Sequence, residues 1–369
     1  MKIKEHFHKY EHEQITYCYD KESGLEAIIA IHDTTLGPAL GGCRFWNYPS
    51  YEEALFDVVR LSRGMTYKAA VAGLPLGGGK SVIIGDPKKL KSEKLFRAFG
   101  QYVNGLAGRY ITAEDVNINV SDVNQIAKET RYVTGVTVGH SGSGDPSPVT
   151  ALGVFCGIKA AVKASKGRDS LEGLTVAVQG CGAVGSYLCY LLHQEGAKLI
   201  VADVNAEVCA KMATLYRAII VPVDQIHRQP ADIYSPCALG GIVNAKTIPD
   251  IQAKIVAGAA NNQLLNEEAD MDALRARGIL YAPDYVINAG GLINVCHELR
   301  GYDEKAAKDE ARKIYHTLSE IFERAKSEDI STLEASNRIV QMRLRAAREK
   351  NGKKMIHCYD NQTWIKARS

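Results

Sequence analysis

The sequence predicts an α/β protein built from two domains, followed by C-terminal helices. A length of 369 residues usually divides into two domains. From about residue 174 onward, short and continuously apolar segments alternate with helical patterns. Such segments are typical of parallel strands in a sheet that helices cover on both faces. One of these segments leads directly into a glycine-rich turn and then into a helical pattern.

The first third of the chain is predicted to alternate short strands with helices. Strands are expected where short apolar runs end at turn-forming residues, at positions 27–31, 81–84 and 110–112. Helices are expected where apolar residues recur at three- and four-residue spacing, at positions 52–63 and 95–106. These elements would form a first α/β domain.

The glycine- and proline-rich stretch from Gly135 to Pro148 is predicted to be a domain boundary or hinge. A surface loop is the alternative interpretation of this stretch. We therefore assign residues 1–145, joined by about 331–369, to one domain and residues 146–330 to the other.

The second domain is predicted to repeat a strand-and-helix pattern. Its strands are expected at positions 174–179, 199–203, 218–221, 233–234, 255–259 and 279–282. Helices are expected at 149–165 and 183–194 and, in the tail of the chain, at about 304–326 and 333–350. The last residues are polar, and no element is predicted there.

The glycine-rich turn is Gly180-Cys181-Gly182-Ala183-Val184-Gly185, which fits the pattern G-x-G-x-x-G. Alone this pattern is weak, and an ordinary turn between strand and helix is the alternative. Its setting strengthens it, because an apolar strand precedes it, a helix follows, and the next strand ends at Asp203. The three glycines would permit the tight turn, the approach of a pyrophosphate and close helix packing. The N–H groups at Ala183 and Val184 would then meet the phosphates, so a Rossmann-type dinucleotide-binding domain is predicted.

Asp203 favours NAD over NADP as the cofactor. Its carboxylate would accept hydrogen bonds from the ribose hydroxyls. No basic residue follows it, since the next positions are Val204, Asn205 and Ala206. A 2′-phosphate would meet a carboxylate with no compensating cation. We therefore expect NAD, with Asp203 and Val204 among the residues that bind it.

Composition argues against several other classes of protein. A net charge of +3 gives no electrostatic case for nucleic acid or anionic lipid as a partner. The nine cysteines are odd in number and include no CxxC pair, which indicates reduced thiols rather than disulfides or a zinc site. The ten histidines show no HExxH-like spacing, so no metal is expected. No stretch approaches about 18 uninterrupted apolar residues, and a soluble, cytoplasmic protein is expected.

A second glycine-rich run, Gly77-Gly78-Gly79, leads into Lys80, twelve residues after Lys68. Because glycine destabilises regular structure, this run indicates a backbone that passes very close to something. A P-loop is excluded, because the position five before Gly79 is Leu74 and because a strand, not a helix, follows. Two lysines near one surface could instead bind an anion with one ammonium and carry out acid/base chemistry with the other.

Six motifs together identify a family. They are GPALGG at 37–42, RGMTYK at 63–68, the triple glycine with Lys80, TAED at 112–115, GAANNQ at 258–263 and APDYVINAGG at 282–291. From about residue 26 to 325 the chain resembles the leucine/phenylalanine/valine branch of the amino-acid dehydrogenases, a superfamily shared with glutamate dehydrogenase. Within that branch it is most similar to the leucine-acting enzymes. The resemblance implies an N-terminal substrate-binding and oligomerisation domain and a Rossmann-type NAD-binding domain.

The resemblance implies roles for three residues of the first domain. Lys80 would be the general acid/base, Asp115 would assist proton transfer near the amino group, and Lys68 would hold the substrate carboxylate. A lysine, whose ordinary pKa is about 10.4, must have its pKa lowered to act as a base near neutral pH. Partial burial and a second ammonium both lower it, whereas an ionised Asp115 would oppose them. The alternatives are a solvated helix residue for Lys68 and a loop cap for Asp115.

The implied reaction is the reversible oxidative deamination of an L-amino acid. Hydride leaves the α-carbon for the nicotinamide and gives an iminium, to which a water activated by Lys80 adds. Collapse of the carbinolamine releases ammonia and a 2-oxo acid. Amides at Asn261, Asn262 and Asn288 could contact the nicotinamide, its ribose or the substrate, with turn capping as the alternative.

The resemblance also implies which residues surround the substrate. Gly41 and Gly42 would contact it, and four apolar residues would form its side-chain pocket, namely Leu40, Ala113, Leu292 and Val295. A glutamate substrate is disfavoured, because its second carboxylate would be desolvated without a partner.

The pocket leaves the choice of hydrophobic substrate open. Ala113 resembles the leucine-acting enzymes, whereas Cys43 and Leu292 look more like the aromatic branch. The pair Asn117-Ile118 departs from the usual Gly-Thr and is similar to a tryptophan-acting relative. Because one methylene changes selectivity by only about 1–3 kcal/mol, leucine is favoured here and phenylalanine or tryptophan is the alternative.

One alternative from a different class is a catalytically inactive dinucleotide-binding protein. The presence of Lys68, Lys80 and Asp115 argues against it, because binding alone would need none of them. The resemblance further implies a homo-oligomer, either a dimer or an octamer, assembled through the N-terminal domain and the C-terminal helices.

Overall fold

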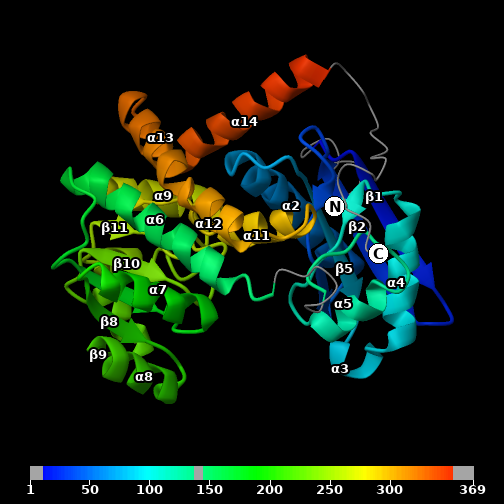
Figure 1. Ribbon diagram of the computed structural model, residues 1–369, viewed down its shortest axis with the longest axis horizontal. Coiled ribbons are helices and arrows are strands. Elements are labelled where there is room, and N and C mark those ends of the chain that lie inside the picture. Colours follow the sequence, from blue (N-terminus) through cyan, green and yellow to red (C-terminus); the bar gives the residue numbers. More distant parts are fainter. Residues whose placement is uncertain (1–10, 137–143, 352–369) are drawn as a thin grey trace. The chain divides into compact units, whose positions relative to one another are not determined.

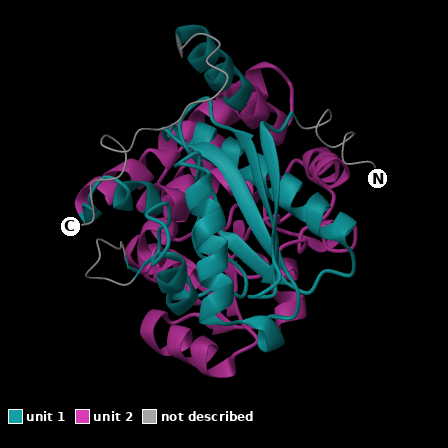
Figure 2. Ribbon diagram, turned by 90° about the vertical axis from the view of Figure 1, so that its right-hand side faces the viewer, with its two compact units in different colours: residues 1–144, 295–304, 340–369 teal, residues 145–294, 305–339 magenta. Residues whose placement is uncertain are grey.

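The computed structural model describes residues 11–136 and 144–351, and the chain divides into two compact units (Figure 1). Unit 1 and unit 2 are drawn in teal and magenta in Figure 2. Residues 1–144, 295–304 and 340–369 belong to unit 1, and residues 145–294 and 305–339 belong to unit 2. The predicted two-domain α/β organisation is confirmed. Residues 137–143, in the middle of the predicted boundary segment, lie outside the described residues.

Unit 1 is built on a mixed sheet. Its strands are β1 (Gln14–Asp20), β2 (Leu25–Asp33), β3 (Ala39–Leu40), β4 (Cys43–Trp46), β5 (Gly77–Ile84) and β6 (Tyr110–Ile111). Their order is β1-β2-β5-β3-β6, and β4 also pairs with β5. The β1, β2 and β5 strands pair antiparallel, whereas β3 and β4 run parallel to β5. The β5 strand therefore has more strand neighbours than any other described strand of this sheet, and it carries the glycine run and Lys80.

Helix α2 (Tyr51–Val71) covers β2 and β5. It begins after Ser50, whose hydroxyl accepts a hydrogen bond from the Glu53 N–H at 3.2 Å. Its apolar face joins the two strands in one cluster, formed by Ile28, Ala30, Ala54, Leu55, Val58, Val59 and Val82. Three shorter helices belong to the same unit, namely α3 (Pro87–Leu90), α4 (Glu93–Gly105) and α5 (Val120–Ile126).

Unit 2 contains a fully parallel sheet. Its strands are β7 (Thr175–Gln179), β8 (Lys198–Ala202), β9 (Ile219–Ile220), β10 (Ile233–Pro236), β11 (Ile255–Val256) and β12 (Leu280–Tyr281). Their order is β12-β11-β10-β7-β8-β9, and every pairing is parallel. This is the 3-2-1-4-5-6 strand order of a dinucleotide-binding fold, with β7 as the first strand. The predicted Rossmann-type architecture is confirmed.

Helices precede, separate and follow the strands of unit 2, and the one at Gly290–Glu298 continues into unit 1. They are α6 (Ser147–Lys166), α7 (Ala183–Gln194), α8 (Ala206–Tyr216), α9 (Glu267–Ala276), α10 (Asp284–Ile287), α11 (Gly290–Glu298), α12 (Glu304–Arg312) and α13 (Ile314–Ser327), with 3-10 turns at Val223–Arg228 and Ile248–Asp250. The last helix, α14 (Thr332–Asn351), begins in unit 2 and ends in unit 1. By length and composition α6 could cross a membrane, but 56% of its apolar stretch is buried inside the protein. It packs against α13, with Gly153 and Gly157 facing Ile314 and Leu318.

The structure differs from the sequence prediction in several places, among them the following three. The β5 strand begins at Gly77 rather than Ser81, because the glycines pair with neighbouring strands, Gly77 opposite Ala39 of β3 and Gly79 opposite Ile31 of β2. The predicted helix at 304–326 is interrupted at Lys313. Residues 295–304, predicted within the second domain, belong to unit 1, where the Glu298 carboxylate accepts a hydrogen bond from the Gly135 N–H at 3.0 Å.

Candidate active site

The glycine run of β5 lies against the protein's own chain. A methyl group added at Gly77 would lie 2.1 Å from the Asp33 carbonyl oxygen, and one at Gly78 would lie 2.1 Å from the Thr66 nitrogen. At Gly79 it would lie 2.7 Å from the Tyr110 ring. The close approach that the sequence predicts is therefore an approach to α2, to the end of β2 and to β6. It allows β5 to sit deep in unit 1 and to carry Lys80 there.

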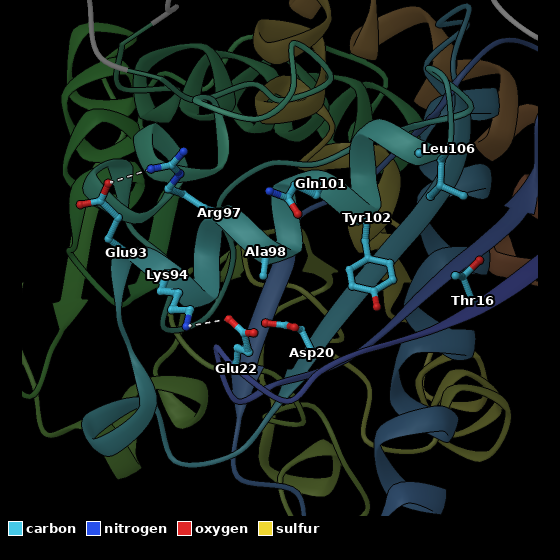
Figure 3. A pocket seen from close by; sticks show the side chains of 11 residues that line it. Thr16, Asp20, Glu22, Glu93, Lys94, Arg97, Ala98, Gln101, Tyr102 and Leu106 are labelled. Carbon is cyan, nitrogen blue, oxygen red and sulfur yellow. Dashed lines mark hydrogen bonds and ion pairs between the residues drawn. The ribbon is translucent and has the colours of Figure 1, made fainter.

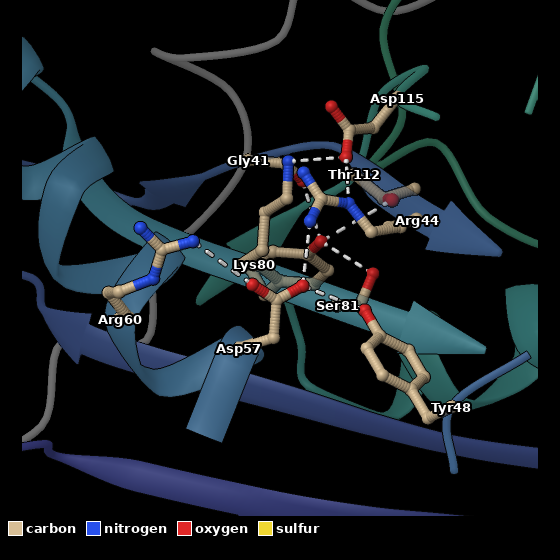
Figure 4. Close-up of polar contacts among 10 residues, drawn as sticks. Gly41, Arg44, Tyr48, Asp57, Arg60, Lys80, Ser81, Thr112 and Asp115 are labelled. Carbon is tan, nitrogen blue, oxygen red and sulfur yellow. Dashed lines mark hydrogen bonds and ion pairs between the residues drawn. The ribbon is translucent and has the colours of Figure 1, made fainter. Parts of the chain in front are cut away.

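Lys80 is buried on β5 and forms an ion pair with Asp115. The side chain of Lys80 is only 7% exposed, and its Nζ lies 2.9 Å from Asp115 Oδ2 (Figure 4). Asp115 follows β6, in the segment that begins with Thr112 and Ala113. Because β6 pairs with β3 and β3 with β5, the sheet brings this segment to Lys80. In the structure, these two residues, to which the resemblance gives roles in one site, are in direct contact.

Arg44 extends this pair into a network that the sequence did not predict. Its Nε donates to Asp115 Oδ2 at 3.1 Å, and its Nη1 donates to Asp57 Oδ2 at 2.7 Å (Figure 4). Tyr48 donates to the same oxygen of Asp57 at 2.8 Å, and Arg60 contacts the other oxygen at 3.3 Å. Arg44 comes from β4, whereas Asp57 and Arg60 come from α2. No local spacing links these positions, so only the fold reveals them.

Asp115 is held in its ionised form. Burial alone would raise the pKa of its carboxyl, but Lys80 and Arg44 outweigh that effect and lower the pKa below the usual value. Asp115 therefore stays a carboxylate at neutral pH.

Other candidate residues of unit 1 lie on the elements around Lys80. Leu40 on β3 is buried, and Ala113 is half-buried. A methyl group at Gly41 would lie 1.7 Å from the Gly79 carbonyl oxygen, and one at Gly42 would lie 2.2 Å from the Glu114 carbonyl oxygen. At both positions the neighbouring backbone leaves no room for a side chain, so glycine is required there whether or not a ligand is bound.

The remaining substrate candidates lie on two other helices. Lys68 is half-buried in the last turn of α2, two residues beyond the Thr66 contact with Gly78. Leu292 and Val295 lie on α11, the first buried and in unit 2, the second half-buried and in unit 1.

The glycine turn of unit 2 has the geometry that a pyrophosphate requires. Gly180 has φ +95°, and a methyl group there would lie 2.6 Å from Ala238 Cβ. A methyl group at Gly185 would lie 2.0 Å from the Gly180 carbonyl oxygen, so this glycine allows α7 to pack closely. At Gly182, by contrast, no described heavy atom lies within 4 Å, which leaves the space that a ligand would use. No side chain caps the N-terminus of α7, where Ala183 is exposed and Val184 half-buried.

Asp203 stands at the end of β8, next to this turn. Its Oδ2 accepts from the Cys181 N–H at 2.7 Å, and its Oδ1 accepts from the Asn205 N–H at 2.9 Å. Both backbone contacts hold the carboxylate in place and leave a lone pair on each oxygen for a ribose hydroxyl. Val204 beside it is 93% exposed. The residues present therefore fit a dinucleotide.

Two of the three candidate amides of unit 2, Asn262 and Asn288, differ in their surroundings. Asn262 is exposed with φ +51°, a conformation that asparagine adopts readily. Asn288 is buried, and its Nδ2 donates to the Ala259 carbonyl at 3.0 Å and to Asn261 Oδ1 at 2.8 Å. Its Oδ1 is buried and has no hydrogen-bond partner among the described residues. That oxygen is an acceptor for a donor group such as a carboxamide.

A groove elsewhere in unit 1 contains none of these candidates. It has a volume of about 890 Å³ and lies between α4 and β1 (Figure 3). Lys94 and Glu22 form an ion pair of 3.4 Å there, and the Tyr102 hydroxyl donates to the Tyr19 carbonyl at 2.6 Å. Among the described residues, no group of three or more His, Cys, Asp or Glu side chains could hold a metal ion.

The chain matches known proteins over nearly its whole length. Residues 12–132 match a family model described as Glu/Leu/Phe/Val dehydrogenase, dimerisation domain. Residues 141–220 and 214–352 match the family model of glutamate/leucine/phenylalanine/valine dehydrogenase. A leucine dehydrogenase of Geobacillus stearothermophilus is 54% identical, over 95% of this chain and 95% of the relative. An L-tryptophan dehydrogenase of Nostoc punctiforme is 50% identical, over 93% of this chain and 96% of the relative. The crystal structure of L-tryptophan dehydrogenase from Nostoc punctiforme covers 94% of this chain and 100% of its own, with a TM-score of 0.85 and 48% identity.

Proposed function

The chain belongs to the Glu/Leu/Phe/Val dehydrogenase family, and on this premise we propose that it oxidatively deaminates a hydrophobic L-amino acid with NAD. The products are the 2-oxo acid, ammonia and NADH, and the reaction is reversible. The observation that carries the proposal is the 2.9 Å ion pair between Lys80, which is buried on the central strand β5 of unit 1, and Asp115, which follows β6.

The residues of unit 1 supply binding and proton transfer. The nicotinamide, when bound, accepts hydride from the substrate α-carbon. Lys68 binds the substrate carboxylate, and Lys80 takes a proton from the water that adds to the α-carbon. Asp115 accepts hydrogen bonds from the substrate amino group, since its Oδ2 is occupied by two cations and its Oδ1 is not. Burial of Lys80 keeps bulk water away from its amine.

We propose leucine and its branched-chain relatives as preferred substrates. Leu40, Ala113, Leu292 and Val295 would surround the side chain, and all four are apolar. The 54% identity to a leucine dehydrogenase supports leucine, whereas the 50% identity to a tryptophan dehydrogenase keeps an aromatic substrate as the alternative. The two identities are close, so kinetics must decide.

A panel of L-amino acids with NAD⁺, followed at the NADH absorbance, tests the substrate. Leucine, isoleucine and valine are expected to give the highest kcat/KM, phenylalanine and tryptophan lower values, and glutamate almost none. A highest value for phenylalanine or tryptophan would keep the reaction and replace the substrate. If no amino acid produced NADH, the proposed function would be wrong.

Substitution of Lys80 separates an enzyme from a non-catalytic dinucleotide-binding protein. Lys80→Ala should lower kcat by about 10²–10⁴, because a positioned general acid/base contributes that much. NADH affinity, measured by fluorescence, should change little, because the glycine turn lies in unit 2. Lys89→Ala on α3 is the matched control, since that side chain is 80% exposed. Full turnover in Lys80→Ala would remove Lys80 from the mechanism.

Three further features belong to the same proposal. NAD is the cofactor rather than NADP, supported by Asp203 and the exposed Val204. The enzyme is a homo-oligomer, dimer or octamer, supported by the dimerisation-domain model that matches residues 12–132. It is cytoplasmic, in keeping with free thiols at every cysteine that the structure describes.

A further inference from the structure

Two cations share one oxygen of Asp115. Lys80 Nζ lies 2.9 Å and Arg44 Nε lies 3.1 Å from Oδ2. The other oxygen, Oδ1, accepts no hydrogen bond from the residues that the structure describes. The carboxylate is therefore turned so that one oxygen is fully engaged and the other is left for a donor from outside the network (Figure 4).

The two cations are not equivalent in a reaction cycle. A lysine that acts as a base must lose its proton before it can accept another, and its ion pair with Asp115 then disappears. An arginine keeps its charge throughout, because its guanidinium does not deprotonate in proteins. Without a second cation, the largely buried Asp115 would face the neutral Lys80 with nothing to stabilise its charge.

We propose that Arg44 is a positioning residue, which keeps Asp115 ionised and its Oδ1 available whether Lys80 is charged or neutral. This inference rests on the proposed function, because it assumes that Lys80 is the acid/base of the reaction. Arg44 touches neither substrate nor cofactor in this role. It acts through Asp115 and, by like-charge repulsion, on Lys80.

Arg44 is itself fixed from the opposite side. Its Nη1 donates to Asp57 at 2.7 Å, and Tyr48 donates to the same Asp57 oxygen at 2.8 Å. A planar guanidinium can hold two carboxylates in this way, whereas a lysine ammonium offers no comparable fixed geometry. The Arg44 side chain is only 22% exposed, so both contacts are partly shielded from water and salt.

The charged and titratable groups around Lys80 and Asp115 come from several elements of unit 1. On β4 they are Arg44 and the buried Cys43 thiol, and Tyr110 on β6 is buried nearby. Burial raises the pKa of Cys43 to about 12, so this thiol stays neutral at physiological pH. Asp57 and Arg60 lie on α2, one step further from Lys80. The lowered pKa of Asp115 agrees with both cations acting on it.

The pH dependence of kcat tests the role of Arg44. Arg44→Met removes one of the two cations beside Asp115 and the like-charge repulsion on Lys80, so the acidic limb of the kcat profile is expected to move to higher pH by about one unit. Near neutral pH this shift lowers kcat about tenfold, and KM for the amino acid changes little because Lys68 binds the carboxylate. In Arg44→Lys the positive charge remains, so the acidic limb of the kcat profile should stay near its original pH. The value of kcat should fall, because the ammonium does not hold Asp115 in the same fixed geometry.

Arg60→Met is the matched control, because it removes the same charge. Arg60 contacts Asp57 from the far side at 3.3 Å and is 48% exposed, without touching Asp115. The acidic limb of the kcat profile of Arg60→Met should lie within about 0.2 pH units of that of the parent enzyme, since an exposed charge is screened. Equal shifts in Arg44→Met and Arg60→Met would overturn the inference, as would an unmoved limb in Arg44→Met.

A measurement without turnover keeps this inference separate from the proposed function. The rate at which acetic anhydride labels Lys80, read from peptide masses across a pH series, reports the protonation of that amine in the folded chain. Arg44→Met should shift this labelling curve to higher pH, and Arg60→Met should not. If the curve shifts but no amino acid is oxidised, the proposed function fails and the electrostatic role stands. Circular dichroism confirms that both variants are folded before labelling.

Discussion

A single residue, Asp203 at the end of β8, is expected to determine whether the enzyme prefers NAD or NADP. Asp203→Asn keeps the shape of the side chain and one acceptor oxygen but removes the negative charge that a 2′-phosphate would meet. The ratio of kcat/KM for NADP⁺ to that for NAD⁺ should rise at least about tenfold, which corresponds to about 1.4 kcal/mol. Steady-state kinetics with both cofactors measures it.

The control for this substitution is Asp272→Asn on α9, an exposed position with the same change of charge. It should leave the cofactor ratio unchanged. An unaltered ratio in Asp203→Asn would mean that this carboxylate does not discriminate against the phosphate. A small loss of stability is also expected in Asp203→Asn, because the amide cannot accept from both Cys181 and Asn205 as the carboxylate does.

Sequence reasoning finds residues whose partners are close in the chain and misses those whose partners are distant. Lys80 stands out because three glycines precede it, and Asp203 stands out because a strand ends there. Arg44 gives no such signal, because Asp115 is 71 positions away and the contact depends on the pairing of β4 with β5. Asn117 gives a partial signal, since it replaces an expected glycine. The structure explains this replacement by φ +58° and a hydrogen bond from its Nδ2 to the Phe45 carbonyl at 3.0 Å.

At the scale of elements, β5 is the strand whose glycines matter most. Gly78→Ala would place a methyl group 2.1 Å from the backbone nitrogen of Thr66 on α2, where nothing flexible can yield. Overpacking of this kind costs about 1–3 kcal/mol or more, because strand and helix must separate. Urea unfolding should show that loss, and kcat should fall as Lys80 moves with the strand.

Gly64→Ala provides the contrast within the same pair of elements. Gly64 is exposed on α2, and no described atom lies within 4 Å of the added methyl. Replacing glycine by alanine inside a helix should stabilise the protein by about 0.8–1 kcal/mol. If the two variants had the same free energy of unfolding, the close contact between β5 and α2 would not be the reason for the glycine run.

Elements that are buried on both faces are the ones that the sequence predicts well. The β7 and β8 strands appear as apolar runs because almost all of their residues are buried, and the predicted α7 has the observed bounds Ala183–Gln194. The β1 strand escapes prediction, because only Cys18 among its seven residues is buried. The β5 strand is predicted only in its second half, because its glycines carry no side chain from which burial could be recognised.

At the scale of the whole molecule, the chain passes between its two units more often than composition indicates. The glycine- and proline-rich signal marks the first passage near Gly144. The passages after Asn294 and after Ile339 fall within α11 and α14, where the helical pattern continues without interruption. A unit boundary inside a helix leaves no turn residues to recognise. The order of the elements was therefore predictable, whereas the return of residues 295–304 to unit 1 was not.

The edge of the unit 1 sheet bears on assembly. Among the described strands β1 pairs only with β2, so its other edge offers unpaired backbone groups that a second copy could bind. Tyr17 and Tyr19 on this strand are 46% and 58% exposed. Exposed aromatic side chains that lie close together often mark a surface that binds another protein. The family model that covers this region is described as a dimerisation domain, which makes β1 a candidate contact between copies.

Light scattering after size exclusion should therefore find a mass that is a multiple of 40.2 kDa for the parent chain. Tyr19→Lys should lower that mass, because a lysine at the centre of an edge-to-edge contact must be desolvated or leave the contact. Tyr190→Lys is the matched control, since Tyr190 is 46% exposed but lies on α7 in unit 2. A mass that falls in both variants would point to general destabilisation. A mass that falls only in Tyr190→Lys would indicate that the copies contact each other through unit 2. The prediction that β1 forms the contact would then be wrong.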